Sequence, residues 1–388
     1  MKNFRFILMM AALILTALCL TGFQEVTEEN PASVELNPVT GTPISNTSLL
    51  TLPPVFVPLA RYPSAFRPST GHSQAQWAFE MYVNNEESRP MLMFYGELPT
   101  APISHISSAI FGLEELRRQY GGIIIAGGTS KSVRESGILS MEQWYGTTGD
   151  KLYPELPVTD YQRILNKWVQ RSTPADPNNL RYTFDAQPLE GGVDARSFYI
   201  RYASTNQVVW VYDEANGRYR RSQNSVEDPG TLNADVDAAN GEQIAVENLI
   251  ILMATHDFVP GHRPELGFFN VNLNYVDSRP ALIMRDGKMY QATWSTISEK
   301  FERDSSRMRP IRFLDENGNN FRLKPGKTWV HIVMPGNPYY EVESELGSKL
   351  TAGSGHWKMP YISFKPGSQE QVESEVTELK SLTYTLNK

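Results

Sequence analysis

Three charged residues, Arg67, Glu80 and Arg89, are the first candidates for chemistry in this sequence. Arg67 lies in a proline-flanked loop, Tyr-Pro-Ser-Ala-Phe-Arg-Pro, over residues 62–68. Glu80 lies inside the apolar stretch Trp-Ala-Phe-Glu-Met-Tyr of residues 77–82. A carboxylate buried in such a stretch needs a charged or hydrogen-bonding partner. We therefore expect these residues either to form a structural Glu–Arg pair or to bind a ligand, and we take all three as candidate ligand-binding residues.

Four other motifs admit a chemical interpretation, each beside a plainer one. Residues 235–241 resemble a calcium loop, but their glycine is displaced and no glutamate stands at the twelfth position, so Asn240-Gly241 is more simply a turn. Residues 256–262 carry two histidines and an aspartate without a standard metal spacing. Residues 127–131, Gly-Gly-Thr-Ser-Lys, lack the full frame of a phosphate-binding loop. The arginines of residues 303–312 indicate either a solvated mixed-charge loop or the capture of an anion. We predict no catalytic residue, no metal site and no cofactor.

The first half of the chain is predicted to combine strands with helices. Apolar stretches predict strands, and apolar residues at helical spacing predict helices; the strands are residues 77–82 and 90–95, and the helices are residues 106–120 and 160–171. Gly121-Gly122 ends the first helix, and a buried strand of residues 123–126 follows. Within that helix, Glu114 and Arg118 stand four residues apart, in the order that favours an ion pair.

The second half is predicted to be rich in β-strands. Asn216-Gly217 and Asp286-Gly287 supply the positive φ angles of hairpin turns. These turns join predicted strands of residues 208–212 with 218–221 and of 281–284 with 288–294, and residues 328–333 form a further strand. The sequence thus predicts an α+β fold, with a layered sheet-and-helix N-terminal half followed by a β-rich, hairpin-containing C-terminal half.

The N-terminus has the pattern of a secretory signal. Lys2 and Arg5 precede an apolar run over residues 6–20, which is shorter than the roughly 20 residues that span a bilayer. We expect the protein to be extracytoplasmic, either secreted or anchored at the outer face of the cytoplasmic membrane. The single cysteine, Cys19, fits a lipoprotein signal poorly because Leu18 precedes it, so lipid attachment stays an alternative to removal with the signal.

The charge pattern excludes one class of partner. The formal net charge is −7, and no basic stripe interrupts the even spread of acidic and basic residues. Nucleic acid is therefore not expected as a partner. Contact with a membrane is expected only through the N-terminal segment.

Several short motifs occur in an order that is similar to a known family. In the first half they are Pro-Val-Thr-Gly at 38–41, Arg-Pro-Ser-Thr-Gly-His-Ser-Gln-Ala at 67–75 followed by Glu80 and Arg89, and Ala-Gly-Gly at 126–128. In the second half they are a segment that begins with Tyr-Asp and ends with Arg-Ser (212–222), one that begins with Asp and ends with Gln (237–243), one that begins with Arg-Asp-Gly and ends with Thr-Trp (285–294), and Pro-Gly-Lys-Thr-Trp at 325–329. Through this collinearity, residues 38–335 resemble the YerB-like family of predicted bacterial lipoproteins. The resemblance implies two consecutive sequence domains, a layered α+β fold and a place at the cell envelope, and it implies no activity.

The chain also departs from the family pattern. Two arginines of the family correspond to Ser107 and Ile110 here, and a family histidine corresponds to Ile125. If these groups bind an anionic ligand in relatives, this chain lacks the positive charge that they provide. The expected divisions are a signal peptide (1–22), a polar linker (23–36), an N-terminal domain (37–184), a C-terminal domain (185–345) and a polar tail (346–388), in which residues 372–382 could form a helix.

Three hypotheses for function follow. The first is a non-catalytic envelope protein that binds a cell-wall fragment, a peptide or a protein, and that ligand would stabilise it. The second is a hydrolase or transferase of envelope polymers that uses Glu80 or another buried carboxylate as general acid or base. The third is a structural or assembly role, which predicts an exposed apolar patch.

Overall fold

The structure, a computed structural model of the 388-residue chain, describes residues 35–61, 64–84, 87–110, 112–128, 144–145, 153–171, 174–203, 205–224, 231–258, 269–334, 340–341 and 354–360. The expected signal peptide, nearly all of the expected linker and the helix expected at 372–382 lie outside these residues. Within them, no helix has the length and apolar character needed to cross a membrane.

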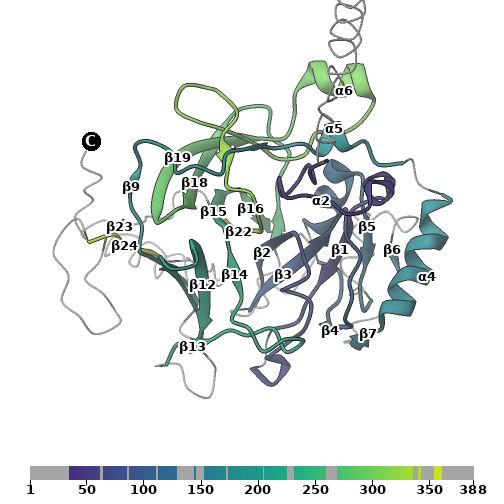
Figure 1. Ribbon diagram of the computed structural model, residues 1–388, viewed down its shortest axis with the longest axis horizontal. Coiled ribbons are helices and arrows are strands. Elements are labelled where there is room, and N and C mark those ends of the chain that lie inside the picture. Colours follow the sequence, from purple (N-terminus) through teal and green to yellow (C-terminus); the bar gives the residue numbers. More distant parts are fainter. Residues whose placement is uncertain are drawn as a thin grey trace, which may run out of the picture. The chain divides into compact units, whose positions relative to one another are not determined.

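One large mixed sheet spans both halves of the sequence. Its strands are β1 (Val55–Pro58), β2 (Trp77–Asn84), β3 (Glu87–Phe94), β5 (Ile123–Ile125), β6 (Trp144–Tyr145), β9 (Val193–Asp194), β15 (Asn248–Met253), β18 (Arg279–Arg285), β19 (Lys288–Ser295), β20 (Arg312–Leu314) and β22 (Thr328–Val333). Their order is β20-β19-β18-β15-β22-β2-β3-β1-β5-β6, with β9 beside β19 (Figure 1).

The N-terminal and C-terminal halves meet at the centre of this sheet. β2 pairs in parallel with β22, so that Glu80 lies opposite His331 and Ala78 lies opposite Trp329. β22 also pairs in parallel with β15. The two sequence halves therefore share one sheet.

A second, smaller sheet belongs mostly to the C-terminal half. It consists of β10 (Ser197–Ala203), β11 (Asn206–Asp213), β12 (Arg218–Gln223), β13 (Asn233–Ala234), β14 (Ala245–Val246), β23 (Tyr340–Glu341) and β24 (His356–Pro360). β24 pairs in parallel with β10, so part of the expected polar tail is a strand of this sheet. Three two-stranded ladders complete the β-structure: β4 (Ile103–Ile106) with β7 (Tyr153–Leu156), β8 (Thr183–Phe184) with β21 (Arg322–Leu323), and β16 (His256–Phe258) with β17 (Phe269–Val271).

Few helices occur among the residues that the structure describes. They are α2 (Leu113–Tyr120), α4 (Val158–Val169), α5 (Pro177–Leu180) and α6 (Glu299–Ser305), with short 3-10 helices η1 (Thr47–Thr51) and η2 (Ser64–Phe66). The apolar side of α2 joins one core cluster, whereas α4 and the second sheet join the other. Because side chains alternate along a strand, β2 supplies Phe79 to the first cluster and Ala78 to the second. Glu80 is two residues from Ala78, so its side chain lies on the same face of β2 and points towards the second sheet.

The expected α+β class, with its β-rich C-terminal half, is confirmed. Both expected hairpins form, with Gly217 at φ 64° and Gly287 at φ 71° in their turns. The helix expected over 106–120 is wrong at its start, since Ile106 ends β4 and the helix begins at Leu113. Gly112 stands before the helix at φ 86°, a left-handed conformation that interrupts the helical path.

Candidate functional site

Glu80 is completely buried between the two sheets. Both of its carboxylate oxygens lie 3.2 Å from the same guanidinium nitrogen of Arg221, which is on β12. The hydroxyl of Ser88 donates to Glu80 at 2.7 Å, and the indole nitrogen of Trp329 donates at 3.1 Å. Both carboxylate oxygens of Glu80 thus accept hydrogen bonds from other side chains.

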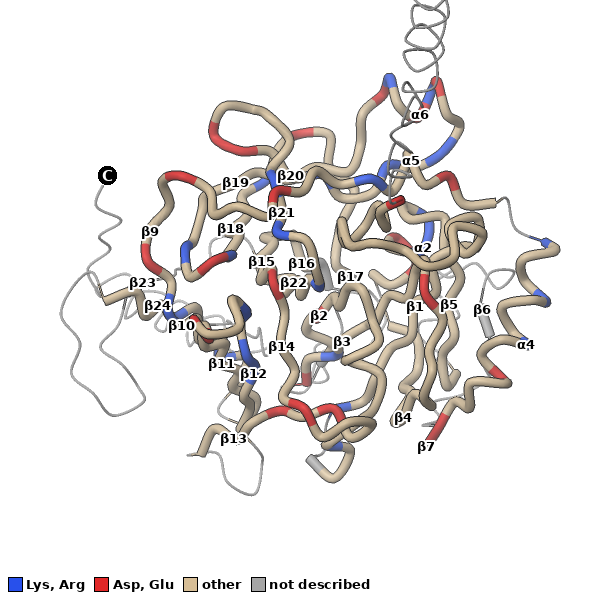
Figure 2. Tube along the Cα trace, in the orientation of Figure 1, with Lys and Arg blue, Asp and Glu red and all other residues tan. Residues whose placement is uncertain are grey.

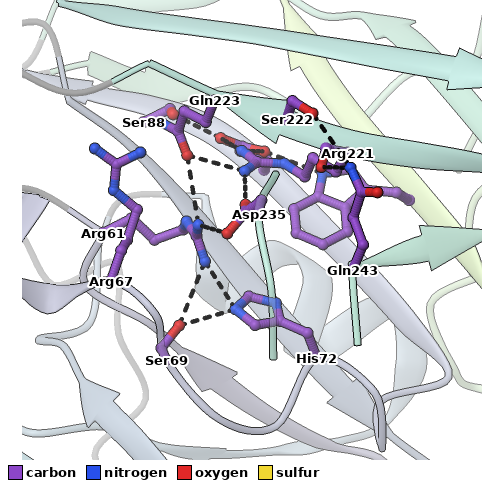
Figure 3. A network of polar contacts seen from close by, with 12 residues as sticks. Arg61, Arg67, Ser69, His72, Ser88, Arg221, Ser222, Gln223, Asp235 and Gln243 are labelled. Atoms are coloured by element: carbon purple, nitrogen blue, oxygen red, sulfur yellow. Dashed lines mark hydrogen bonds and ion pairs between the residues drawn. The ribbon is translucent and has the colours of Figure 1, made fainter. Parts of the chain in front are cut away.

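Arg221 is the centre of a larger buried network (Figure 3). It joins Glu80 to Asp235, and Asp235 in turn forms an ion pair with Arg61. The guanidinium carbon of Arg221 also lies 5.1 Å from the ring centroid of Trp329. Gln223 accepts from Arg221 at 2.9 Å and donates to Asn206. Asn206 in turn donates to the hydroxyl of Ser88, which closes the network at Glu80.

Two buried histidines belong to this region and are neutral at pH 7. Burial lowers the pKa of His331 to about 4. Burial together with the charge of Arg61 lowers the pKa of His72 to about 3. Because the indole of Trp210 donates to Nε2 of His331, the proton of this ring must be on Nδ1, which lies 2.8 Å from the hydroxyl of Tyr202.

The charges of the network cancel. Burial alone would raise the pKa of Glu80, but Arg221 together with His331, Ser88 and Arg61 outweighs burial, and the pKa lies below its usual range. In the same way, Arg61 and Arg221 outweigh burial at Asp235 and lower its pKa. Two carboxylates therefore face two guanidinium groups, and no charge is left over for a ligand. The network therefore holds the two sheets together.

One corner of the network resembles a nucleophile with its base. The hydroxyl of Ser69 lies 3.0 Å from Nε2 of His72. Arg61 lies 2.9 Å from the same nitrogen and can only donate, so it occupies the lone pair that a general base needs. Ser69 and His72 are also buried, at 0% and 6% exposure. This pair is arranged to support Arg61 rather than to activate a nucleophile.

The other two predicted residues do not contact Glu80. Arg67 donates to the carbonyl of Asn224 at 2.7 Å, and Figure 3 draws it beside the network. Arg89 pairs with Glu87 at 2.8 Å and donates to the carbonyl of Ser108. The three residues therefore do not form one site in the described contacts, and their ligand-binding role stays a prediction. The sequence alone does not single out Arg221, because only Tyr219, two residues earlier, indicates that this face of β12 is buried. In the structure, Arg221 and Gln223 are buried on that face, and Arg218 and Arg220 are exposed on the other.

The aspartates of the calcium-like motif have partners within the protein. Asp235 is held by Arg61 and Arg221. Asp237 accepts from the backbone nitrogen of Ser73 at 2.6 Å and of Gly71 at 3.2 Å. The plainer interpretation as a structural turn therefore accounts for the motif, and no cluster of metal-ligating residues occurs in the described part of the chain.

An open pocket lies elsewhere, in the C-terminal half, and we call it the acidic pocket. Its volume is about 680 Å³, and its walls come from Asp185 and from residues 188–193, 289–291, 315–317 and 321–322. Tyr290 and Phe321 form an apolar part of the wall, with ring centroids 5.8 Å apart. A Cβ at Gly192 would stand 2.8 Å from the Tyr290 ring, so the close approach of this segment requires glycine.

The acidic pocket carries more negative than positive charge. Asp185, Glu190, Asp315 and Glu316 line it, with Arg322 as its cation. Arg322 is paired with Asp185 at 2.8 Å, and Asp315 accepts backbone donors of its own turn. Glu190 and Glu316 are exposed, and neither has a hydrogen bond or ion pair with any residue that the structure describes. This pocket can attract a positively charged group and offer it an aromatic surface.

Comparisons with known proteins agree with this fold. Residues 198–330 match the family model described as the C-terminal domain of a protein of unknown function, DUF3048. The crystal structure of the YerB protein from Bacillus subtilis is similar, with a TM-score of 0.60 and 20% sequence identity. That match covers 77% of this chain and 96% of the other. No similar sequence is found among curated proteins.

Proposed function

Since these matches confirm that the chain is YerB-like and carry no assigned function, we propose that it is an exported, envelope-associated protein that binds its ligand without catalysis. The ligand is a cell-wall fragment, peptide or protein segment that carries a positively charged amine. Support for export comes from the basic residues Lys2 and Arg5 and from the apolar run that follows them.

The observation that carries the proposal is the acidic pocket. Its volume falls within the range of about 300–1,000 Å³ that is usual for small-molecule sites. Glu190 and Glu316 provide carboxylates with no partner among the described residues, and Tyr290 and Phe321 provide ring surface. An ammonium group could pair with the carboxylates while an attached apolar portion packs against the rings.

The alternative of a polymer hydrolase or transferase finds less support. A general acid must be protonated before it acts, and the pKa of Glu80 lies below its usual range. Glu80 is also 0% exposed, with both oxygens in contact with donors. Its geometry therefore suits a structural ion pair.

Titration calorimetry of the full chain with a lysine tripeptide, and with the same peptide acetylated on its side chains, tests the proposal. We expect saturable binding of the unmodified peptide and at least tenfold weaker binding of the acetylated one. The double variant Glu190→Gln/Glu316→Gln should lose this preference. The matched control, Asp277→Asn/Glu299→Gln, removes two exposed acidic charges outside the pocket and should bind as the wild type does. Equal binding by both double variants would refute the proposal.

A further inference from the structure

A second pocket is formed by three segments that are distant in sequence. It has a volume of about 290 Å³ and is lined by residues from the end of α2, from the region around α5 and from the segment after α6. Three of its lining residues are arginines, Arg117, Arg118 and Arg307, and one is acidic, Asp176. We call it the arginine pocket. Figure 2 shows basic residues on α2 and on the segments next to α5 and α6.

One of these arginines has a structural role. The guanidinium of Arg117 makes two hydrogen bonds of 2.7 Å to the carboxylate of Glu114 and also donates to the carbonyl of Gly122. This pair replaces the Glu114–Arg118 pair that the sequence predicts. A cation near the end of a helix also interacts favourably with its dipole, so Arg117 needs no ligand to explain it.

The other arginines are not explained in this way. Among the described residues, no carboxylate lies within 4.0 Å of the side-chain nitrogens of Arg118, Arg307, Arg309 or Arg312. Arg307 reaches the carbonyl of Pro174 across the pocket at 3.4 Å. Arg312 donates to the carbonyl of Asn179, which lines the pocket.

The surroundings of the pocket are therefore electropositive. Burial and the neighbouring charge of Arg312 lower the pKa of Arg309, so two like charges lie close together here. The nearby acidic residue, Asp176, accepts from the backbone nitrogen of Asn178 and begins α5. Glu302 offsets part of this charge at Arg309, and the remaining excess of positive charge raises the local concentration of anions.

We propose that the arginine pocket binds a phosphate group. Guanidinium groups match phosphate oxygens in a bidentate geometry, and Arg118 and Arg307 approach the pocket from different segments. The ligand is either free phosphate or a phosphodiester within a larger envelope molecule. This site is independent of the acidic pocket, since the two pockets share no lining residue.

Titration of the full chain with inorganic phosphate and with dimethyl phosphate tests the inference. We expect saturable binding of inorganic phosphate that weakens at least tenfold in Arg118→Gln/Arg307→Gln. The matched control, Arg171→Gln/Arg303→Gln, removes two exposed arginines that do not line the pocket and should bind as the wild type does. Additional binding of dimethyl phosphate would support a phosphodiester ligand, whereas binding of inorganic phosphate alone would support a free or terminal phosphate.

Two results would overturn the inference. One is equal weakening in both double variants, which would indicate general charge attraction. The other is that neither phosphate probe saturates the wild type. Glu190→Gln/Glu316→Gln should bind phosphate as the wild type does, so failure here is distinguishable from failure of the acidic-pocket proposal.

Discussion

The buried network and the acidic pocket both contain several charged residues, but they differ in how those charges are compensated. In the network, Glu80 and Asp235 face Arg61 and Arg221, and all four side chains are almost completely excluded from solvent. In the acidic pocket, Glu190 and Glu316 are exposed and have no partner among the described residues. The first arrangement fixes two sheets against each other, and the second leaves charge for a ligand.

The difference shows why a buried carboxylate is weak support for catalysis. Burying an unpaired charge is costly, so Glu80 persists in the core only because Arg221 accompanies it. The pairing that makes Glu80 tolerable also removes its freedom to exchange protons. Exposed carboxylates at an open pocket reduce the stability of the fold little, and they are available to a ligand.

The largest expected effect is on stability and comes from the network. Glu80→Gln leaves Arg221 without one of its two compensating charges, and breaking a buried pair in this way costs about 3–5 kcal/mol. Chemical denaturation should show that loss in the free energy of unfolding. Glu190→Gln should change it by less than about 0.5 kcal/mol because it is exposed. Similar values for the two variants would remove the distinction between the regions.

The second effect is a loss of stability in acid. The pKa of His331 is about 4 in the folded protein and ordinarily 6.5, so between these values the unfolded chain binds a proton that the folded one does not. Stability should therefore fall as the pH decreases from 6.5 to 4, by on the order of 3 kcal/mol for this histidine. The carboxylates of Glu80 and Asp235 add a further loss at lower pH, since their pKa values are also lowered in the folded state.

Denaturation curves at several pH values check this second prediction. His331→Gln should show a smaller slope of stability against pH than the wild type across the interval between the folded and the ordinary pKa of this residue. An unchanged slope would mean that His331 is not a neutral, buried ring.

A smaller effect on stability is expected from substitutions at two adjacent glycines of the acidic pocket, and it differs between them. Both have positive φ, 75° at Gly191 and 69° at Gly192, but a Cβ at Gly191 would meet open space. Gly191→Ala should cost only the backbone strain of about 1 kcal/mol. Gly192→Ala also presses on the Tyr290 ring, for a total of about 2–3 kcal/mol, and should weaken binding of the lysine tripeptide. Equal effects of the two variants on stability and binding would contradict the close packing of this wall.

The sequence predicts local features of this fold well. The hairpins at Asn216-Gly217 and Asp286-Gly287 form because the turn chemistry lies within a few residues. The parallel pairing of β2 with β22 has no local signal, since Trp329 and Glu80 are 249 residues apart. The apolar spacing does not show the helix boundary at Gly112, because buried Ala109 and Ile110 continue that spacing without belonging to the helix.

The candidate site was predictable only in part. The apolar neighbours of Glu80 indicate correctly that it needs a partner, but they do not identify Arg221 on a distant strand. The Gly191-Gly192 pair is visible in the sequence, whereas its role as a pocket wall depends on β19 and on residues 315–317. Pockets assembled from separate segments require the tertiary structure.

The most direct test compares Glu80→Gln and Glu316→Gln in one experiment, thermal unfolding with and without the lysine tripeptide. The proposed roles predict that Glu80→Gln lowers the melting temperature strongly and is still stabilised by the peptide. Glu316→Gln should melt near the wild-type temperature and lose most of the stabilisation. If instead Glu80→Gln abolishes the peptide's effect at a wild-type melting temperature, the buried network is the ligand site and the roles assigned to the two regions are wrong.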